Sequence, residues 1–344
     1  MRRTKPYFVA EMSGNHNQSL AKAKEIIDAA VKSKADAVKI QTYTADTITL
    51  NCDKSDFLIN DPKSLWNGRK LHDLYQEAHT PWEWHKELFE HAKKRNITLF
   101  SSPFDKTAID FLEELGNPIY KIASFEIVDI PLIEYAAKTK KPLIISTGIA
   151  TLSEISEAIV AAKDAGATDL TILHCVSSYP APYEEINLKT MNAIKDTFNV
   201  KIGLSDHSLG MGVAIAAVAY GASLIEKHFV IDRSEGGVDS AFSMEPHEFK
   251  LMIEESEKAY LSLGNIAFRY SSTENKQQRQ FARSLYIAED MKKNDIFTEK
   301  NVRSVRPGFG LAPKELKNIL GKRVIKDTTK GTPLSLDLVD FKIN

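Results

Sequence analysis

Residues 203–208 read Gly-Leu-Ser-Asp-His-Ser, and residues 224–229 read Leu-Ile-Glu-Lys-His-Phe. Each stretch begins with apolar residues, as a buried strand does, and ends in hydroxyl or charged residues. The separation of about twenty residues leaves room for one helix between two parallel strands. We therefore interpret them as the last two strands of a parallel barrel, with His207 and His228 side by side at its carboxyl end.

Short β-rich runs alternate with amphipathic stretches from residue 7 to about residue 263. Eight strands alternating with helices over about 260 residues fit the α/β class and a (β/α)8 TIM barrel. An open doubly wound sheet is the alternative, but no Gly-x-Gly-x-x-Gly loop follows the first strand. The predicted strands are 7–13, 37–43, 98–104, 120–126, 143–149, 170–178, 201–208 and 224–232. Predicted helices include 19–34, 81–95, 246–263 and 153–165, the last beginning at Ser153.

Two regions do not follow this alternation. Residues 44–80 form a connection far longer than usual βα loops. It is either a surface insertion with its own short helix or a lid that helps to select the substrate. Beyond residue 263 the chain becomes polar and then basic, with short β-like runs and glycines. We predict a catalytic barrel over 1–263, a linker over 264–281 and a small β-rich domain over 282–344.

The composition excludes several classes of protein. Of the 344 residues, 43% are hydrophobic and 26% are charged, as in soluble globular proteins. The net charge of -1 gives no reason to expect nucleic acid or an anionic membrane as a partner. The two cysteines, Cys52 and Cys175, do not form a disulfide framework. No apolar stretch resembles a signal peptide or a membrane span, so we expect a cytoplasmic protein.

Polar residues gather at the predicted carboxyl ends of all eight strands, where TIM barrels place their active sites. One polar strand end alone is commonly a cap or faces solvent, whereas eight together indicate a site. In chain order they are Glu11; Lys39 and Gln41; Ser101 and Ser102; Lys121, Ser124 and Glu126; Ser146 and Thr147; Ser177 and Tyr179; Ser205, Asp206 and His207; and Glu226, Lys227 and His228.

The alternation of side chains along a strand refines this set. Lys227 points away from the site and is predicted to be structural, in the layer between barrel and helices or paired with Asp206. Lys121 and Ser124 differ in parity, so both can face the site only where the strand bends or ends between them. Pairs two residues apart share a face, namely Lys39 with Gln41, Ser205 with His207, and Glu226 with His228.

His207 and His228 predict a divalent ion held by two neutral imidazoles beside Glu11 and Asp239, with positions open for water and substrate. For either histidine alone, a hydrogen bond to a core carbonyl is the alternative. Two protein ligands suit a loosely held ion better than a structural zinc. We expect Mn²⁺, with Mg²⁺ or Co²⁺ as alternatives.

The lysines and serines at the other strand ends predict a cradle for a phosphate and a carboxylate, because they supply charge and short hydrogen bonds. A lysine could instead form a Schiff base with a carbonyl substrate, as in a class I aldolase. A metal that activates the carbonyl makes an imine unnecessary, so the histidine pair counts against that mechanism. The cradle residues are Lys39, Ser102, Lys121, Ser124, Ser146 and Ser205.

Short motifs stand at most of these strand ends: 10–16 (Ala-Glu-Met-Ser-Gly-Asn-His), 39–41 (Lys-Ile-Gln), 101–104 (Ser-Ser-Pro-Phe), 120–124 (Tyr-Lys-Ile-Ala-Ser), 146–148 (Ser-Thr-Gly), 203–207 (Gly-Leu-Ser-Asp-His) and 226–228 (Glu-Lys-His). Together they resemble the sialic acid synthase family. The C-terminal Arg283-Ser-Leu and Val305-Arg-Pro-Gly308 resemble that family's antifreeze-like (SAF, β-clip) domain. The resemblance covers nearly the whole chain and implies a TIM barrel followed by this small domain. It also implies condensation of phosphoenolpyruvate with an N-acyl amino sugar, giving a nine-carbon keto acid and phosphate.

The resemblance implies a role for each residue. The cradle binds phosphoenolpyruvate, and His207 and His228 hold a metal that binds the aldehyde oxygen of the open-chain sugar. Glu126 places the water that adds at C2, and Glu11 reaches a metal-bound water or a sugar hydroxyl. The implied catalytic residues are these two histidines and two glutamates, together with Lys121. The implied sugar contacts are Gln41, Phe104, Ser177, Tyr179, Asp239 and, from the small domain of the partner in a homodimer, Arg306.

Two departures from the family's motifs narrow the choice of sugar substrate. Residues 237–240 read Gly-Val-Asp-Ser where sialic acid synthases carry Gly-Pro-Asp-His, and Ser177 replaces an Asn. Residues 65–75 and 239–243 resemble instead the branch that makes pseudaminic acid. Its sugar, 2,4-diacetamido-2,4,6-trideoxy-L-altrose, carries a methyl group at C5, which predicts an apolar wall from Trp66, Phe104 and Phe242. A sialic or legionaminic acid synthase, and a carbohydrate-binding protein on an inactive barrel, are the alternatives.

Overall fold

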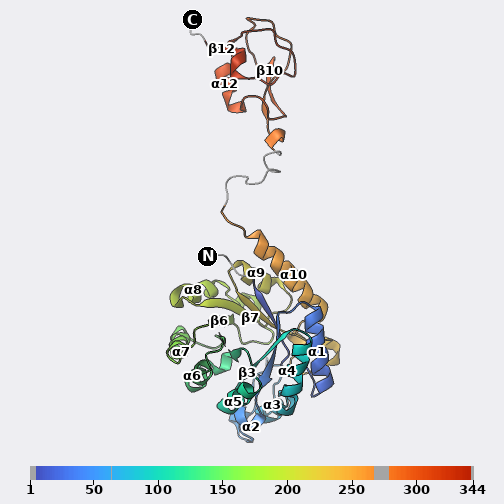
Figure 1. Cartoon of the computed structure of the whole chain (residues 1–344), viewed down its shortest axis with the longest axis vertical. Helices are drawn as coiled ribbons and strands as arrows, with labels where there is room; N and C mark the ends of the chain where they lie inside the picture. Colours follow the sequence, from blue (N-terminus) through green and yellow to red (C-terminus); the bar gives the residue numbers. More distant parts are fainter. Residues whose placement is uncertain (1–4, 63, 267–278, 342–344) are drawn as a thin grey trace. The chain divides into compact units, whose positions relative to one another are not determined.

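The computed structural model describes residues 5–62, 64–266 and 279–341. The chain divides into two compact units, Met1–Gly264 and Asn265–Asn344 (Figure 1). Most of the predicted linker, residues 267–278, lies outside the described residues.

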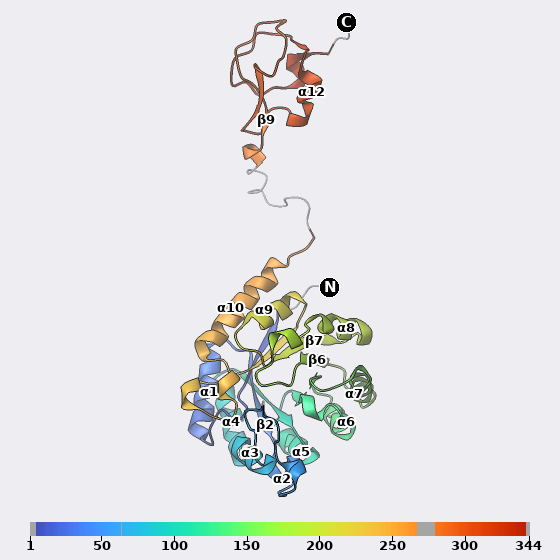
Figure 2. The same cartoon turned by 180° about the vertical axis from the view of Figure 1, so that it is seen from behind.

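The first unit is a closed barrel of eight parallel strands that pair in sequence order, which confirms the predicted TIM barrel. Figures 1 and 2 show the helices arranged around the outside of these strands. The strands are β1 (Tyr7–Glu11), β2 (Ala37–Thr42), β3 (Thr98–Pro103), β4 (Tyr120–Ile122), β5 (Leu143–Ser146), β6 (Leu170–Cys175), β7 (Lys201–Asp206) and β8 (Leu224–His228).

Every strand ends one to four residues earlier than the sequence patterns predicted. The clearest case is β4, which ends at Ile122 and is followed by a 3-10 turn over Ser124–Glu126. The strand therefore ends between Lys121 and Ser124, and both side chains line the same cavity despite their different parity.

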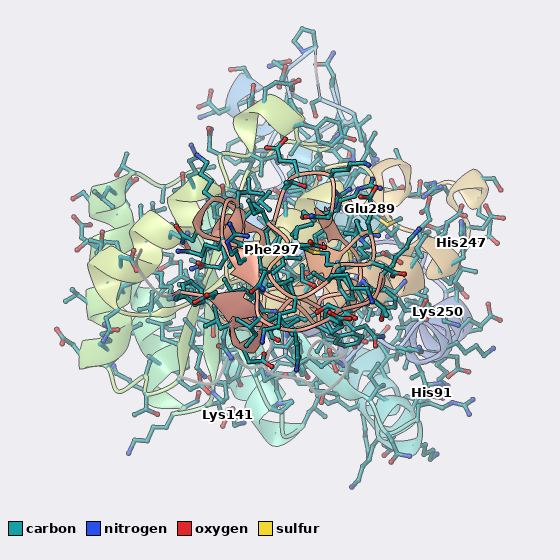
Figure 3. All side chains as sticks on the ribbon, turned by 90° about the horizontal axis from the view of Figure 1, so that it is seen from above. His91, Lys141, His247, Lys250, Glu289 and Phe297 are labelled. Atoms are coloured by element: carbon teal, nitrogen blue, oxygen red, sulfur yellow. The ribbon has the colours of Figure 1, made fainter. Side chains whose placement is uncertain are left out.

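The outer layer consists mainly of amphipathic helices with their apolar faces against the barrel. The predicted start of α7 at Ser153 is wrong. The helix begins at Leu152, and Thr151 is its N-cap in a capping box with Glu154. Polar side chains such as His91 on α4 and Lys250 on α10 lie on the outer surface (Figure 3). The barrel helices are α1 (Leu20–Lys32), α4 (His85–Lys94), α5 (Lys106–Glu114), α6 (Ile130–Lys138), α7 (Leu152–Asp164), α8 (Lys189–Phe198), α9 (Gly212–Ala219) and α10 (Pro246–Ser262).

The interior of the barrel is filled by apolar side chains that lie two residues before polar ones on the same strands. Because residues two apart share a face, a polar layer must lie directly above this apolar layer. The apolar residues are Val9, Ala37, Phe100, Ile144, Leu173 and Leu224. The polar residues above them are Glu11, Lys39, Ser102, Ser146, Cys175 and Glu226.

The insertion over residues 44–80 contains two short helices, α2 (Ala45–Ile48) and α3 (Leu71–Ala78). Between them the backbone folds back on itself. Leu58 and Lys70 form an isolated bridge, and the amide of Ile59 donates to the carbonyl of Arg69 at 2.9 Å. The predicted short helix in this insertion is confirmed, and the segment also lines the cavity described below.

The C-terminal unit has its own apolar core, which includes Leu285, Phe297, Val324 and Leu334. Its regular elements are short, as the sequence predicted for a small β-rich domain. They are the antiparallel pairs of β9 (Ser284–Ile287) with β10 (Val302–Val305) and β11 (Arg323–Val324) with β12 (Val339–Asp340), together with α12 (Leu316–Ile319). Among the described helices, none is long and apolar enough to cross a membrane.

Candidate active site

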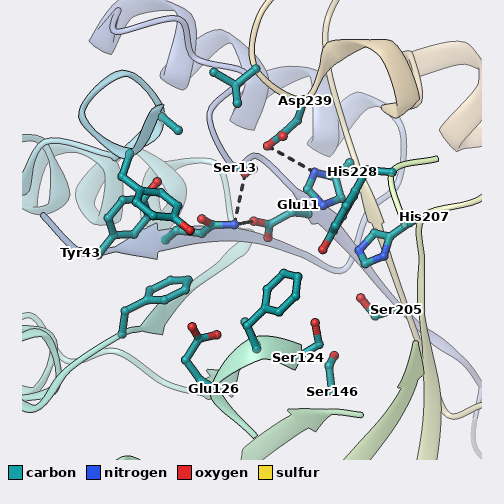
Figure 4. A pocket seen from close by; sticks show the side chains of 18 of the residues that line it. Glu11, Ser13, Tyr43, Ser124, Glu126, Ser146, Ser205, His207, His228 and Asp239 are labelled. Carbon is teal, nitrogen blue, oxygen red and sulfur yellow. Dashed lines mark hydrogen bonds and ion pairs between the residues drawn. The ribbon is translucent and has the colours of Figure 1, made fainter. Parts of the chain in front are cut away.

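The carboxyl ends of the strands and the insertion surround a cavity of about 330 Å³. Figure 4 shows acidic, hydroxyl and imidazole groups converging on it from several strands. Most of the predicted site residues line this cavity: Glu11, Lys39, Gln41, Phe104, Lys121, Ser124, Glu126, Ser146, Tyr179, Ser205, His207, His228 and Asp239.

Two buried lysines lie at the floor of the cavity, each beside a carboxylate. Lys39 Nζ lies 2.7 Å from Glu11 Oε2 and donates to Ser102 Oγ at 3.1 Å. Lys121 Nζ lies 3.3 Å from Glu226 Oε1, which also accepts from Ser205 Oγ at 3.1 Å. An ammonium group has three donors, so each lysine can still donate to an incoming anion.

Burial and the neighbouring carboxylates shift the pKa values of these two lysines in opposite directions. Burial lowers the pKa of Lys121, and the nearby Lys39 lowers it further against the attraction of Glu226. Burial also lowers the pKa of Lys39, but Glu11 and Glu226 outweigh it and leave that pKa raised. Lys39 is therefore firmly cationic, which favours an anionic ligand at this end of the cavity.

Serine hydroxyls surround the lysine pair. Ser124 Oγ and Ser177 Oγ are hydrogen-bonded at 2.7 Å. Ser146 Oγ is buried and has no hydrogen-bond partner among the described residues. A buried hydroxyl without a partner is costly, which is consistent with a ligand that supplies the missing bond.

Glu126 faces the cavity from the turn after β4. Burial raises the pKa of its carboxyl to about 7. Its Oε2 atom is buried and lacks a hydrogen-bond partner within the described part of the chain. A carboxyl group that titrates near neutral pH is suited to orienting a water molecule or exchanging a proton with it.

The two histidines are neighbours, with ring centroids 5.4 Å apart. His207 Nδ1 donates to the carbonyl of Val176 at 3.0 Å, which leaves Nε2 as the atom available to a ligand. Burial lowers the pKa of His228 well below its usual value, so this imidazole is neutral. Its Nδ1 atom is buried, has no hydrogen-bond partner in the part of the chain that the structure describes, and lies 3.8 Å from Asp239 Oδ2.

No set of three or more His, Cys, Asp or Glu side chains within the described ranges is arranged to hold a metal ion. Two imidazoles with free nitrogen atoms therefore fit a loosely held divalent ion rather than a structural zinc. Strand register places Glu11 beside both Lys39 and His228, so the anion cradle and the imidazole pair occupy neighbouring strand ends. Gln41 Nε2 donates to Glu11 Oε1 at 2.9 Å (Figure 4).

Aromatic and aliphatic side chains form the wall of the cavity above this polar floor. Tyr179 packs on His207 with ring centroids 4.4 Å apart, and Tyr43 packs on Phe104 at 5.0 Å. The insertion contributes Ile48, Ile59, Trp66, Leu71, Leu74, Tyr75 and Ala78. The cavity is thus charged at one end and apolar at the other.

The remaining predicted residues do not line the cavity. Ser102 and Ser177 lie directly behind it, bonded to Lys39 and Ser124. Phe242 packs on His228 with ring centroids 4.9 Å apart. Arg306 belongs to the second unit, so its role remains a prediction. Lys227 is structural as predicted, because its Nζ donates to Asp206 Oδ2 at 2.8 Å in a fully buried pair.

Several residues of the cavity were not assigned a role from the sequence. Glu226 shares a face with His228, which was a usable signal, but its contacts with Lys121 and Ser205 cross the barrel. Cys175 lies two residues after Leu173 on the same face of β6 and also lines the cavity. Of the insertion residues in the cavity, Trp66 was predicted from the sequence as part of an apolar wall. The others follow no strand alternation, and only the folded chain shows that they reach the site.

Comparison with known proteins identifies both units. A model of the NeuB family matches residues 26–267, and one of the SAF domain matches residues 282–340. Pseudaminic acid synthase of Helicobacter pylori is 47% identical over 335 residues, which are 97% of this chain and 98% of the relative. N,N'-diacetyllegionaminic acid synthase of Campylobacter jejuni is 38% identical over 326 residues, 94% of this chain and 97% of the relative.

Among solved structures, the N-acetylneuraminic acid synthetase of Leptospira borgpetersenii in complex with citrate is 32% identical, with a TM-score of 0.71. The match covers 80% of this chain and 90% of that one. These matches confirm the resemblance inferred from the motifs. The chain belongs to the NeuB family and carries a SAF domain at its C-terminal end.

Proposed function

We propose that this protein condenses phosphoenolpyruvate with 2,4-diacetamido-2,4,6-trideoxy-L-altrose to give pseudaminic acid and phosphate. The observation that carries the proposal is the pairing, in one cavity, of the Lys39–Lys121 floor with the His207–His228 pair. The substrate branch is supported by the higher identity to pseudaminic acid synthase, 47%, than to diacetyllegionaminic acid synthase, 38%.

In this proposal the polar floor binds phosphoenolpyruvate. Lys39 and Lys121 hold its phosphate and carboxylate through charge-assisted hydrogen bonds. The unpartnered hydroxyl of Ser146 gains an anionic acceptor when the ligand enters. The full set of residues that we assign to this ligand is Lys39, Ser102, Lys121, Ser124, Ser146 and Ser205.

His207 and His228 would hold a divalent metal ion, and we propose Mn²⁺, with Mg²⁺ or Co²⁺ as substitutes. The free nitrogen atoms of the two neighbouring rings fit this assignment. When bound, such an ion would polarise the aldehyde of the open-chain sugar. Glu11, which is paired with Lys39 on the strand next to His228, would then reach a sugar hydroxyl or a water molecule on the ion.

The remaining steps use the residues of the chain. The cavity aligns C3 of phosphoenolpyruvate with the aldehyde carbon, and the electrons of the C2–C3 double bond form a C–C bond between them. The aldehyde C=O double bond opens in the same step, and its oxygen gains a proton from water and becomes a hydroxyl group. A water held by Glu126 adds at C2. The bond between C2 and the phosphate oxygen then breaks, which releases phosphate and leaves the keto group. Gln41, Phe104, Ser177, Tyr179 and Asp239 are proposed to position the sugar.

The assembly and the location belong to the same proposal. We propose a barrel over residues 1–263, a linker over 264–281 and a SAF domain over 282–344. In a homodimer, the partner's Arg306 would bind the acyl group of the sugar. The two substrates are small polar molecules, and we propose that the enzyme works in the cytoplasm.

The test is phosphate release from phosphoenolpyruvate by Mn²⁺-loaded protein, with N-acetylmannosamine and the L-altro and legionaminic-type diacetamido sugars compared. We expect turnover mainly with the L-altro sugar, lost with chelator and in His207→Ala. Lys201→Met, at an exposed ion pair away from the cavity, is the control and should keep its activity. Preference for another sugar would refute the substrate, and absence of phosphate release with all three would refute the reaction.

A further inference from the structure

Trp66 joins the insertion to the loop that follows β8. Its indole Nε1 donates to the carbonyl oxygen of Val238 at 3.1 Å. Both residues line the cavity, although 172 positions separate them in the sequence. The bond therefore closes one side of the cavity by linking a segment after β2 to a segment after β8.

The same indole also reaches the residues around the imidazole pair. Its ring lies 5.8 Å, centroid to centroid, from Tyr179, which packs directly on His207. On the other side, Val238 precedes Asp239, whose carboxylate lies 3.8 Å from His228. Trp66 thus contacts the surroundings of both histidines from the outer, apolar end of the cavity.

Contacts within the insertion itself also hold its chain in place. The amide of Gly68 donates to the carbonyl of Ile59 at 2.7 Å, and Lys70 is paired with Asp53 at 2.6 Å. A segment that is ordered internally and fastened at its tip acts as a wall rather than as a loose loop. Its surface toward the cavity is aliphatic and aromatic, from Ile48 to Ala78.

We propose that Trp66 is a positioning and specificity residue for the end of the sugar that does not react. It fastens the insertion across the cavity, so that an apolar wall receives the methyl and acyl groups of a deoxy, acetamido sugar. A hydroxyl group pressed against this wall would lose its bonds to water without replacement, which disfavours hydroxymethyl analogues. This inference rests on the proposed reaction and extends it to the residue that selects the sugar.

Trp66→Phe keeps an apolar ring and removes the N–H donor, and Trp66→Ala removes both. With Mn²⁺-loaded full-length protein, we expect Trp66→Phe to raise KM for the sugar about fivefold and to leave KM for phosphoenolpyruvate within twofold. Trp66→Ala should raise the sugar KM further and reduce the preference for the 6-deoxy over the 6-hydroxy sugar about tenfold. Trp84→Phe, which packs on His16 away from the cavity, is the matched control and should change neither.

Two outcomes would overturn the inference: an unchanged sugar KM and preference in Trp66→Ala, or an equal rise in KM for both substrates. If the L-altro sugar proves not to be the best substrate, the proposed substrate fails, whereas the KM comparison can still be made with the sugar that is used.

A second measurement leaves Trp66 in place and follows its fluorescence instead of the reaction rate. In protein with Trp82→Phe and Trp84→Phe, the remaining tryptophan is Trp66, because the chain has three tryptophans. Sugar added with inorganic phosphate, which permits no turnover, should protect its fluorescence from acrylamide quenching, and phosphate alone should not. Absence of protection by saturating sugar would contradict the inference.

Discussion

Gly148 follows β5 where the chain passes between two serines of the site. A Cβ atom at this position would lie 2.1 Å from Ser177 Oγ and 2.5 Å from Ser124 Cβ. Real Cβ atoms do not approach so closely, so both serines, or the backbone of residue 148 itself, must move. The requirement for glycine here comes from space in the site rather than from an unusual backbone angle.

Gly148→Ala should therefore raise KM for phosphoenolpyruvate about tenfold or more, because a displaced hydrogen bond to a charged group costs about 1.5–3 kcal/mol. Steady-state kinetics with phosphate release measures this change. Gly212→Ala is the control, since no atom lies within 4 Å of a Cβ built there. Wild-type KM in Gly148→Ala would show that Ser124 does not contact this substrate.

The raised pKa of Glu126 predicts that the activity depends on pH near neutrality. Burial raises the pKa of its carboxyl to about 7 from 4.5. The ionised form accepts hydrogen bonds from water, so kcat/KM for phosphoenolpyruvate should increase as pH rises through about 7. Glu126→Gln should lower kcat about 100-fold and remove this limb of the profile. A limb that persists in Glu126→Gln belongs to another group.

The raised pKa of Glu126 also affects the stability of the fold, which decreases as pH rises, whereas the activity increases. The folded protein binds the proton of Glu126 more tightly than the unfolded chain does, because the folded-state pKa is the higher one. The contribution of this group to stability is therefore present below pH 4.5 and is lost as pH rises toward about 7. The carboxyl is retained in the fold at a cost in stability at neutral pH, as is common at functional sites.

At the scale of elements, two Lys–Asp ion pairs involve strand β7 and differ strongly in burial. Lys227 on β8 pairs with Asp206 on β7 at 2.8 Å, with side chains 1% and 0% exposed. Lys201 on β7 pairs with Asp169 at the same distance, with side chains 60% and 46% exposed. Breaking a buried pair leaves an uncompensated charge, whereas an exposed pair is replaced by water.

Lys227→Met should thus destabilise the barrel by about 3–5 kcal/mol, and Lys201→Met by less than about 1 kcal/mol. Urea unfolding followed by circular dichroism measures both. Equal losses in the two variants would contradict the assignment of Lys227 as a structural residue.

Helix α7 illustrates why element ends are difficult to predict. Ser153 and Thr151 both have side chains that can cap a helix. The structure uses Thr151, whose hydroxyl accepts from the amide of Glu154 while the Glu154 carboxylate bonds back to the amide of Thr151. This reciprocal pair satisfies two free amides, so the helix begins one residue before Ser153.

At the scale of the whole molecule, the remaining prediction concerns Arg306 in the SAF domain. Arg306 and Arg303 are both exposed, and Arg303 belongs to β10. If the partner's Arg306 binds the acyl group of the sugar, Arg306→Ala should raise KM for the sugar about tenfold and leave KM for phosphoenolpyruvate unchanged. Arg303→Ala is the matched control. Unchanged sugar affinity in Arg306→Ala would refute this role.

The amino-acid sequence alone determined the barrel, because eight apolar strands and their helices each follow a local period. It also determined the polar floor, since alternation along each strand places Glu11, Lys39 and Glu226 above apolar partners. The family followed from motifs at those same strand ends, and the comparisons confirmed it.

Only the tertiary structure decided which groups meet across the barrel and over its mouth. The pairing of Lys121 with Glu226, the constraint on Gly148 and the bond from Trp66 to Val238 all join distant parts of the chain. Residues 44–80 follow no single period that assigns their faces. Their role depends on closure of the barrel, because closure brings the loop after β2 beside the loop after β8.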